Sequence, residues 1–84
     1  GWNQVRQMHP HPMWAGIADD SRFYFVHSYC VTGLPDEQVS GGCEYGIQFA
    51  AAATRRNVFA VQFHPEKSAD AGLQLLENFL RWQP

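Results

Sequence analysis

The residues with the clearest chemical potential are a histidine and a glutamate two positions apart, in the string Phe63-His64-Pro65-Glu66. Residues two apart in an extended chain point to the same side, so the carboxylate of Glu66 is expected to reach the imidazole of His64. Such a contact selects one tautomer of the ring and stabilises the imidazolium once the ring takes a proton. The pair has the composition of a general base with its orienting carboxylate, which still needs a thiol or hydroxyl nucleophile.

The residues around this pair predict its place in the fold. Residues 58–63 are apolar on both alternating faces, which is typical of a strand covered on both sides. His64 follows the carboxyl end of that strand, where open α/β sheets usually place their functional sites. Pro65 disfavours the helical conformation for His64 and helps to keep the turn extended. A histidine after a strand is more often an ordinary loop residue, however, so this motif alone does not establish catalysis.

The segments before this strand are mostly strand-like and are separated by residues typical of turns. The segment at residues 23–29 is the clearest strand, because it is aromatic and β-branched with apolar side chains on both faces. In chain order, the other predicted features are a short strand over 1–5, one helical turn over 13–17, breaks at 33–36 and 40–42, one or two strands over 43–53, and a hairpin turn over 54–57.

The final element is predicted to be an amphipathic helix. Ser68 is placed to cap its first turn, Asp70 suits the positive end of its dipole, and Pro84 follows its end. At about 100° per residue, its apolar side chains fill one broad side that must pack on something large, most naturally a sheet. The fold class is therefore α/β, with several strands and one C-terminal helix. The apolar side consists of Leu73, Leu75, Leu76, Phe79, Leu80 and Trp82, opposite Gln74, Glu77, Asn78 and Arg81.

Composition argues against several classes of function. Six Lys and Arg against eight Asp and Glu, with a net charge of -2, give no basic surface for nucleic acid or an anionic membrane. No apolar run is long enough to span a bilayer, and the two widely spaced cysteines favour a reduced, cytoplasmic setting. No cofactor is indicated. A metal site has little support, because no Cys or acidic cluster accompanies the four histidines His9, His11, His27 and His64.

Several motifs in the same order resemble the class I, or triad, glutamine amidotransferases. The string Phe63-His64-Pro65-Glu66 after an apolar strand is similar to the His/Glu signature of that family. The extended form His64-Pro65-Glu66-Lys67-Ser68, followed by an Ala-Gly-Leu helix, narrows the resemblance to the glutaminase subunit of imidazole glycerol phosphate synthase, an enzyme of histidine biosynthesis. The other segments that agree are Gly1-Trp2-Asn3-Gln4-Val5, Phe23-Tyr24-Phe25-Val26-His27-Ser28-Tyr29, and Glu44-Tyr45-Gly46 leading into Phe49.

This resemblance covers essentially residues 1–84 but only the C-terminal part of the family's longer domain. It implies a C-terminal fragment of the amidotransferase fold, an interpretation that the start at Gly1 without an initiator Met also favours. The implied activity is hydrolysis of glutamine to glutamate and ammonia through a Cys-His-Glu triad. The ammonia then serves a cyclase subunit that builds imidazole glycerol phosphate.

The resemblance also implies roles for individual residues. His64 would be the general base and acid, and Glu66 its orienting carboxylate. His27, Ser28 and Tyr29 would border the glutamine site, with backbone groups of the last two near the carboxylate end of the substrate. Trp2, Tyr24 and Lys67 would lie at the cyclase interface, near the mouth through which ammonia passes. Two alternatives have equal weight: the two aromatic side chains pack in the core, and Lys67 is a solvated charge.

The family's nucleophile has no counterpart in this chain. It is a Cys on a tight, glycine-flanked strand-to-helix turn, and it belongs to the missing N-terminal part together with the oxyanion-stabilising backbone. Cys30 is followed by Val31-Thr32, with no small residues, and Cys43 follows Gly41-Gly42 but leads into a strand and a turn. Both cysteines are interpreted as structural. Without a nucleophile and an oxyanion hole, the chain is predicted to be inactive alone.

Two functions from different classes therefore stay open. The first is an enzyme part that works with the missing N-terminal part of the glutaminase and with the cyclase. The second is a non-catalytic module that forms a homodimer or binds another protein, because a cut sheet leaves an unpaired edge and bare apolar surface. The mass of the chain in solution distinguishes the two.

Overall fold

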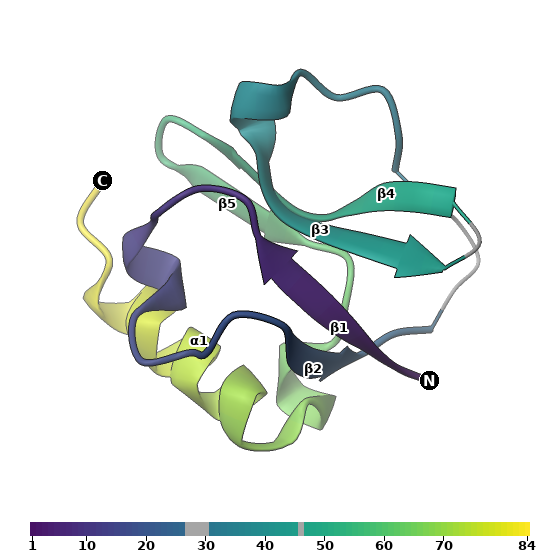
Figure 1. The fold of residues 1–84 in the computed structure, drawn as a ribbon. Helices are drawn as coiled ribbons and strands as arrows, with labels where there is room; N and C mark the ends of the chain where they lie inside the picture. The colour runs from purple at the N-terminus through teal and green to yellow at the C-terminus, as the bar shows by residue number, and fades with distance from the viewer. Residues whose placement is uncertain (27–30, 46) are drawn as a thin grey trace.

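The computed structural model describes residues 1–26, 31–45 and 47–84. Within these residues the chain forms strands, short 3-10 helices and one α-helix (Figure 1). The predicted N-terminal strand and the helical turn near Trp14 are both present. In chain order, the elements are β1 (Trp2–Gln7), η1 (Pro12–Trp14), β2 (Ser21–Tyr24), η2 (Asp36–Gln38), β3 (Val39–Tyr45), β4 (Ile47–Arg55), β5 (Val58–Val61), η3 (Pro65–Lys67) and α1 (Ala69–Arg81).

The described strands form one curled sheet in the order β2-β1-β3-β4-β5 (Figure 1). Every pair of neighbouring strands runs antiparallel. β4 and β5 are joined by a tight hairpin turn, in which Arg56 has a φ of 55°. The predicted turn is therefore confirmed, although it is shorter than expected because β4 extends to Arg55. The order leaves β2 and β5 at the two edges of the sheet.

Residues 40–42, which were predicted to interrupt the chain, lie inside β3. A methyl group on Gly41 would lie 2.8 Å from Cγ1 of Val5 and 3.1 Å from the ring of Trp14. The missing side chain therefore lets β1, β3 and η1 approach each other closely, and an irregular register between Val39 and Gly42 accommodates the contact. The prediction was wrong because a glycine in a strand can mark close packing as well as a turn.

The two most apolar strands are covered on one face and not on both. Phe23 of β2 and Phe25 just beyond it are buried, whereas Val26 is exposed. β5 alternates in the same way, with Val58 exposed and Phe59 half-buried. Because α1 and η1 cover only one face of the sheet, side chains on the other face stay exposed within the described residues. The expectation of coverage on both faces was therefore wrong for the residues described here.

The core lies between the sheet and a layer formed by α1 and η1 (Figure 1). Aromatic rings supply much of it. The rings of Phe23 and Phe63 have centroids 4.2 Å apart, and Phe63 also meets Phe25 edge to face at 5.7 Å. Since Phe63 directly precedes His64, this cluster anchors the candidate catalytic turn to β2. Within the described ranges, α1 and the shorter helices do not have the length and apolarity needed to cross a membrane.

α1 packs through a face that overlaps the predicted one only in part. Leu75 and Asn78 point inward and are buried. Nδ2 of Asn78 donates to the carbonyl oxygens of Met13 and Ala15, each at 2.8 Å. The prediction from apolar periodicity was therefore correct for Leu75 and for the half-buried Trp82, and wrong for Asn78, which is buried because η1 presents carbonyl groups that require a polar partner. Four apolar side chains, here called the outer face of α1, are exposed instead: Leu73, Leu76, Phe79 and Leu80.

Candidate active site

The turn that carries His64 joins the two edges of the sheet. β5 ends at Val61, and Gln62 N still donates to Ala51 O of β4 at 2.9 Å. Two residues later the chain has crossed to β2, where His64 N donates to Tyr24 O at 2.8 Å. The curled sheet is thereby closed at this point, and the backbone of His64 is held by the opposite edge strand.

His64 and Glu66 make the predicted contact. Nδ1 of His64 lies 3.1 Å from Oε1 of Glu66. The backbone differs from the prediction, because only His64 is extended (φ -100°, ψ 100°) and Pro65–Lys67 forms the 3-10 helix η3. This short helical turn keeps the carboxylate near the ring that precedes it. The contact is therefore as predicted, but it is made by a compact turn and not by an extended one.

This contact determines which ring nitrogen is available for chemistry. A carboxylate on Nδ1 favours the tautomer with its proton there, which leaves Nε2 as a proton acceptor. Nε2 can then take a proton from a nucleophile and return it to a leaving group. The side chains of His64 and Glu66 are 43% and 56% exposed, so water screens their attraction. We therefore interpret the pair as orienting the ring and not as stabilising the fold.

The three residues predicted at the partner interface lie around this turn. Trp2 and Tyr24 are paired across β1 and β2, with ring centroids 5.6 Å apart and planes at 74°. Lys67 is exposed at the end of η3, and its backbone N donates to His64 O at 3.1 Å. Trp2 is also exposed, so core packing does not account for it. The backbones of Tyr24 and Lys67 are thus bonded to that of His64, and the ring of Trp2 contacts the ring of Tyr24.

The residues predicted to bind substrate, together with one of the cysteines, fall in the segment between Phe25 and Val31. Before that segment, Phe25 N donates to Gly1 O at 2.8 Å. After it, Ala50 N donates to Val31 O at 2.8 Å. The predicted residues themselves lie outside the described part of the chain: His27, Ser28, Tyr29 and Cys30.

Cys43 is a buried residue of β3 and pairs with Phe49 of β4. The strand continues past it to Tyr45, so Cys43 does not occupy a turn between a strand and a helix. A nucleophile needs a thiolate that is reachable by substrate, and nucleophilic cysteines typically lie in partly exposed, electropositive surroundings. The environment of Cys43 is instead typical of a structural cysteine.

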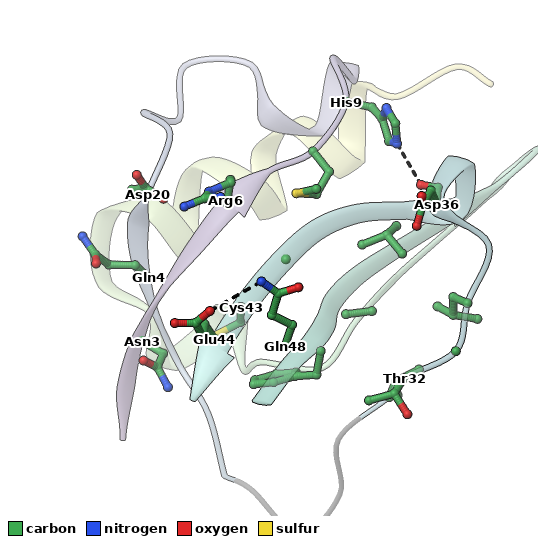
Figure 2. A pocket seen from close by; sticks show the side chains of 18 residues that line it. Asn3, Gln4, Arg6, His9, Asp20, Thr32, Asp36, Cys43, Glu44 and Gln48 are labelled. Carbon is green, nitrogen blue, oxygen red and sulfur yellow. Dashed lines mark hydrogen bonds between the residues drawn. The ribbon is translucent and has the colours of Figure 1, made fainter. Parts of the chain in front are cut away.

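A cleft in the described part of the chain is separate from the His64 turn. It has a volume of about 790 Å³, and the described residues that line it include neither His64 nor Glu66. Figure 2 shows side chains of β1 on one side, such as Arg6, and Glu44 and Gln48 of the β3–β4 hairpin on the other. Gln48 Nε2 donates to Glu44 Oε2 at 3.5 Å across part of this surface. Its mixed polar lining gives no recognisable catalytic arrangement.

The other histidines that the structure describes take part in local hydrogen bonds. Nε2 of His9 lies 2.8 Å from Asp36 O, at one end of the cleft (Figure 2). Nδ1 of His11 accepts from Met13 N at 3.0 Å at the start of η1. Burial lowers the pKa of His11 below its ordinary value of 6.5. Among the described residues, no group of three or more His, Cys, Asp or Glu side chains could hold a metal ion.

Sequence reasoning missed two residues behind the candidate catalytic turn. Ser68 makes no side-chain capping bond to α1, in contrast to the prediction. Its hydroxyl contacts the backbone of His64 and Tyr24 instead. Gly72 lies directly behind Pro65, since a Cβ there would be 1.9 Å from Pro65 O. A glycine inside a helix costs about 1 kcal/mol relative to alanine, so its presence was an available signal of close packing.

Comparison with known proteins agrees with this geometry. Residues 1–82 match the family described as "Glutamine amidotransferase class-I". All 84 residues align with a protein named imidazole glycerol phosphate synthase subunit HisH from Dechloromonas aromatica (strain RCB), with 64% identity over 39% of that relative's length. HisH proteins from Aromatoleum aromaticum and Nitrosomonas europaea are each 57% identical over 40% of their length. The chain therefore spans less than half of the relatives that it matches.

The family match extends over nearly the whole chain and includes the turn at which the structure pairs His64 with Glu66. The described α/β architecture, an antiparallel sheet followed by a C-terminal helix, corresponds to part of the fold of this family. The chain belongs to the class-I glutamine amidotransferase family.

Proposed function

We propose that this chain supplies the His64–Glu66 half of a Cys-His-Glu triad that hydrolyses glutamine to glutamate and ammonia. The observation that carries the proposal is the 3.1 Å contact between Nδ1 of His64 and Oε1 of Glu66, which leaves Nε2 to act as the base. Membership of the amidotransferase family and relatives named HisH support glutamine as the substrate and imidazole glycerol phosphate synthesis as the use of the ammonia.

In the proposed reaction, Nε2 of His64 takes the proton of a cysteine thiol, and the thiolate attacks the carboxamide carbon of glutamine. The ring returns this proton to the leaving nitrogen, so that ammonia departs and a thioester remains. The same nitrogen then takes a proton from water, which attacks the thioester, releases glutamate and restores the thiol. Glu66 keeps the ring oriented and stabilises the imidazolium in both halves of the reaction.

The matched segment covers 39% and 40% of the length of two of these relatives, and the thiol in this proposal comes from an N-terminal part outside that segment. Cys43 is buried within the sheet, and Cys30 lies outside the described residues. The same N-terminal part would provide the oxyanion-stabilising backbone, while His27, Ser28 and Tyr29 would border the glutamine site from this side. The 84-residue chain alone is accordingly expected to be inactive, because both nucleophile and oxyanion stabilisation are needed for most of the rate enhancement.

A cyclase subunit is the proposed partner that receives the ammonia. Trp2, Tyr24 and Lys67 would contact it, because they lie around the His64 turn and two of them are exposed. Tryptophan and tyrosine are frequent anchors of protein interfaces. The ammonium group of Lys67 would suit an acidic residue on the partner, an arrangement that Lys67→Glu should disrupt.

The test mixes this chain with a separately produced, cysteine-bearing N-terminal part and the cyclase, and measures glutamate release. We expect activity only in the complete mixture, and a loss of at least about a hundredfold in kcat with His64→Ala, because the general base is removed. His9→Ala is the matched control, since it removes an exposed histidine outside the turn. Inactivity of pieces that demonstrably associate would contradict the proposal, and activity of the chain alone would contradict the assignment of the nucleophile.

A second candidate, non-catalytic self-association, is favoured by the outer face of α1. Leu73 and Leu80 are 63% and 83% exposed and lie about two helical turns apart. Two copies that bury these faces against each other would form a homodimer. This function predicts the mass of two chains in sedimentation experiments, a return to monomer with Leu76→Lys, and no association with the cyclase.

A further inference from the structure

A buried serine connects the candidate catalytic turn to the edge of the sheet. The side chain of Ser68 is 1% exposed. Its hydroxyl donates to His64 O at 2.5 Å and accepts from Tyr24 N at 2.9 Å. Both partners are backbone groups outside α1, although Ser68 directly precedes that helix. The side chain therefore forms hydrogen bonds with the turn and with β2, and not with the helix that it was predicted to cap.

The hydrogen bonds among these three residues form a closed ring. Tyr24 O accepts from His64 N at 2.8 Å, and Tyr24 N donates to the Ser68 hydroxyl, which donates to His64 O. The N–H and the C=O of His64 are thus both tied to one residue of β2, the first directly and the second through the hydroxyl. Two points of attachment restrict rotation of the His64 backbone, which a single hydrogen bond would permit.

The backbone on the other side of Ser68 is also tightly constrained. Ala69 has a φ of 51°, a conformation that residues with a Cβ rarely adopt. Gly72 N donates to Ser68 O at 3.1 Å, and a Cβ at Gly72 would lie 1.9 Å from Pro65 O. Such strained conformations persist where the surrounding structure over-determines them, often at functional sites. The start of α1 is thus held firmly against the turn.

We propose that Ser68 is a positioning residue, whose buried hydroxyl holds the His64 backbone against Tyr24 so that Nδ1 stays within reach of Glu66. The hydroxyl acts through the backbone of His64 and not on the ring. Without it, the amide of Tyr24 loses its acceptor, while His64 O keeps its bond from Lys67 N. The His64 peptide can then rotate about its remaining contacts, which moves the ring relative to the carboxylate. The catalytic consequence rests on the proposed function, whereas the effect on the ring does not.

The direct test follows the His64 ring by nitrogen-15 NMR in the 84-residue chain and compares Ser68→Ala with Ser40→Ala. Ser40 is a matched control, because it is also buried (3% exposed) and its Oγ has no hydrogen-bond partner within the described residues. At a pH at which the imidazole is neutral, the wild type and Ser40→Ala should show the ring protonated at Nδ1. Ser68→Ala should show the tautomer mixture of a solvated imidazole, with exchange of the Tyr24 amide faster by about tenfold or more.

Retention of the Nδ1 tautomer and of slow Tyr24 exchange in Ser68→Ala would overturn the proposal. If Ser68→Ala does not fold, Ser68→Thr and Ser68→Val replace it, because they have nearly the same shape and differ by the hydroxyl. The threonine variant should keep the tautomer and the valine variant should lose it, whereas equal behaviour of the two would count against the role. Hydrogen exchange of the wild-type Tyr24 amide at the rate of a solvent-exposed amide would also count against the role of Ser68.

Kinetics in the reconstituted mixture extend the test to catalysis. Ser68→Ala should lower kcat by about tenfold or more and leave KM within about twofold, because a displaced base slows the chemical step and not the binding of glutamine. Ser40→Ala should keep both constants. A change in KM alone would overturn the positioning role. A mixture that is inactive with the wild-type chain contradicts the proposed function instead, and the NMR comparison then decides the role of Ser68.

Discussion

The turn at His64 and the outer face of α1 are close in the sequence, but they are supported in opposite ways. At the turn, the N–H and the C=O of His64 both have partners, and the side chain behind them is a buried hydroxyl. On the outer face, four apolar side chains of α1 are exposed. The polar turn at His64 is thus held by hydrogen bonds, whereas the apolar outer face of α1 is exposed. The comparison shows that hydrogen bonds and close packing, and not apolar content, determine how α1 lies on this sheet.

The inner face of α1 explains this orientation. Gly72 allows the helix to approach the carbonyl of Pro65, and Asn78 satisfies two carbonyl groups at η1. Rotating the helix to bury Leu76 and Leu80 would separate both contacts and leave the carbonyl group of the buried Met13 without this donor. Unsatisfied buried polar groups cost about 1–3 kcal/mol each, which can outweigh the gain from burying further hydrocarbon.

Gly72→Ala should have the largest effect on this arrangement. In an ordinary helix interior this change raises stability by about 1 kcal/mol. Here the new Cβ would lie 1.9 Å from Pro65 O, so the turn or the helix has to move. We expect a loss of about 3 kcal/mol in the free energy of unfolding, measured by urea denaturation. An increase in stability would show that the turn and the helix are not in close contact.

The next largest effect is expected from Asn78→Ala, compared with Leu80→Ala on the outer face. Loss of the Asn78 amide leaves the carbonyls of Met13 and Ala15 without this donor and should cost about 2 kcal/mol. Leu80→Ala should change the free energy of unfolding by less than about 0.5 kcal/mol, since the side chain is exposed. Denaturation at several protein concentrations checks both values. A larger cost for Leu80→Ala at high concentration would indicate that the outer face is covered by a second copy.

A smaller change in the free energy of unfolding is expected at the junction between the turn and α1, and its sign tests whether Ala69 is strained. Ala69 has a φ of 51°, so Ala69→Gly should raise the free energy of unfolding by about 1 kcal/mol by relieving the left-handed conformation. Ala71→Gly, two residues later inside α1, should lower it by about 1 kcal/mol. Thermal melts of the two variants should therefore shift in opposite directions. Shifts in the same direction would argue against strain at Ala69.

The smallest effect is expected from pH, through His11 in the layer next to α1. Its ring packs against Phe59 and Trp82, and burial lowers its pKa below 6.5. Protonation is then less favourable in the folded chain than in the unfolded chain, so the stabilising contribution is complete above about pH 6.5 and is lost as pH falls through the lower folded-state pKa. His11→Asn keeps a side-chain acceptor for Met13 N but does not titrate. Its melting temperature should fall less on acidification than that of the wild type, and equal slopes would contradict the assignment.

The features that were predicted correctly depend on residues close together in the sequence. The strand near Trp2, the hairpin turn at Arg56 and the helix after Ser68 all follow from local patterns. The contact between His64 and Glu66 was also predicted, although the turn proved to be a 3-10 helix and not an extended segment. Two residues apart, these side chains meet in either backbone conformation, so the error in conformation did not affect the contact.

The features that were missed depend on segments far apart in the sequence. Residues 40–42 continue a strand because Gly41 must leave room for Val5, which local composition does not reveal. The strands ending at Tyr24 and Val61 were expected to be covered on both faces, but α1 and η1 cover one face of the sheet and leave Val26 and Val58 exposed. The pattern of apolar side chains predicted α1 correctly, but of its buried face it predicted only Leu75 and Trp82.

Sequence alone was enough to identify the His64–Glu66 pair, the C-terminal helix and a resemblance to the family, because side-chain reach and motif spacing are local properties. Only the tertiary structure decided what holds the pair in place and which side of α1 is covered. The bond from Tyr24 N to Ser68 joins residues 44 positions apart, and the bond from Asn78 to Met13 spans 65 positions. A donor in one segment has a determined role only after the fold has brought its acceptor beside it.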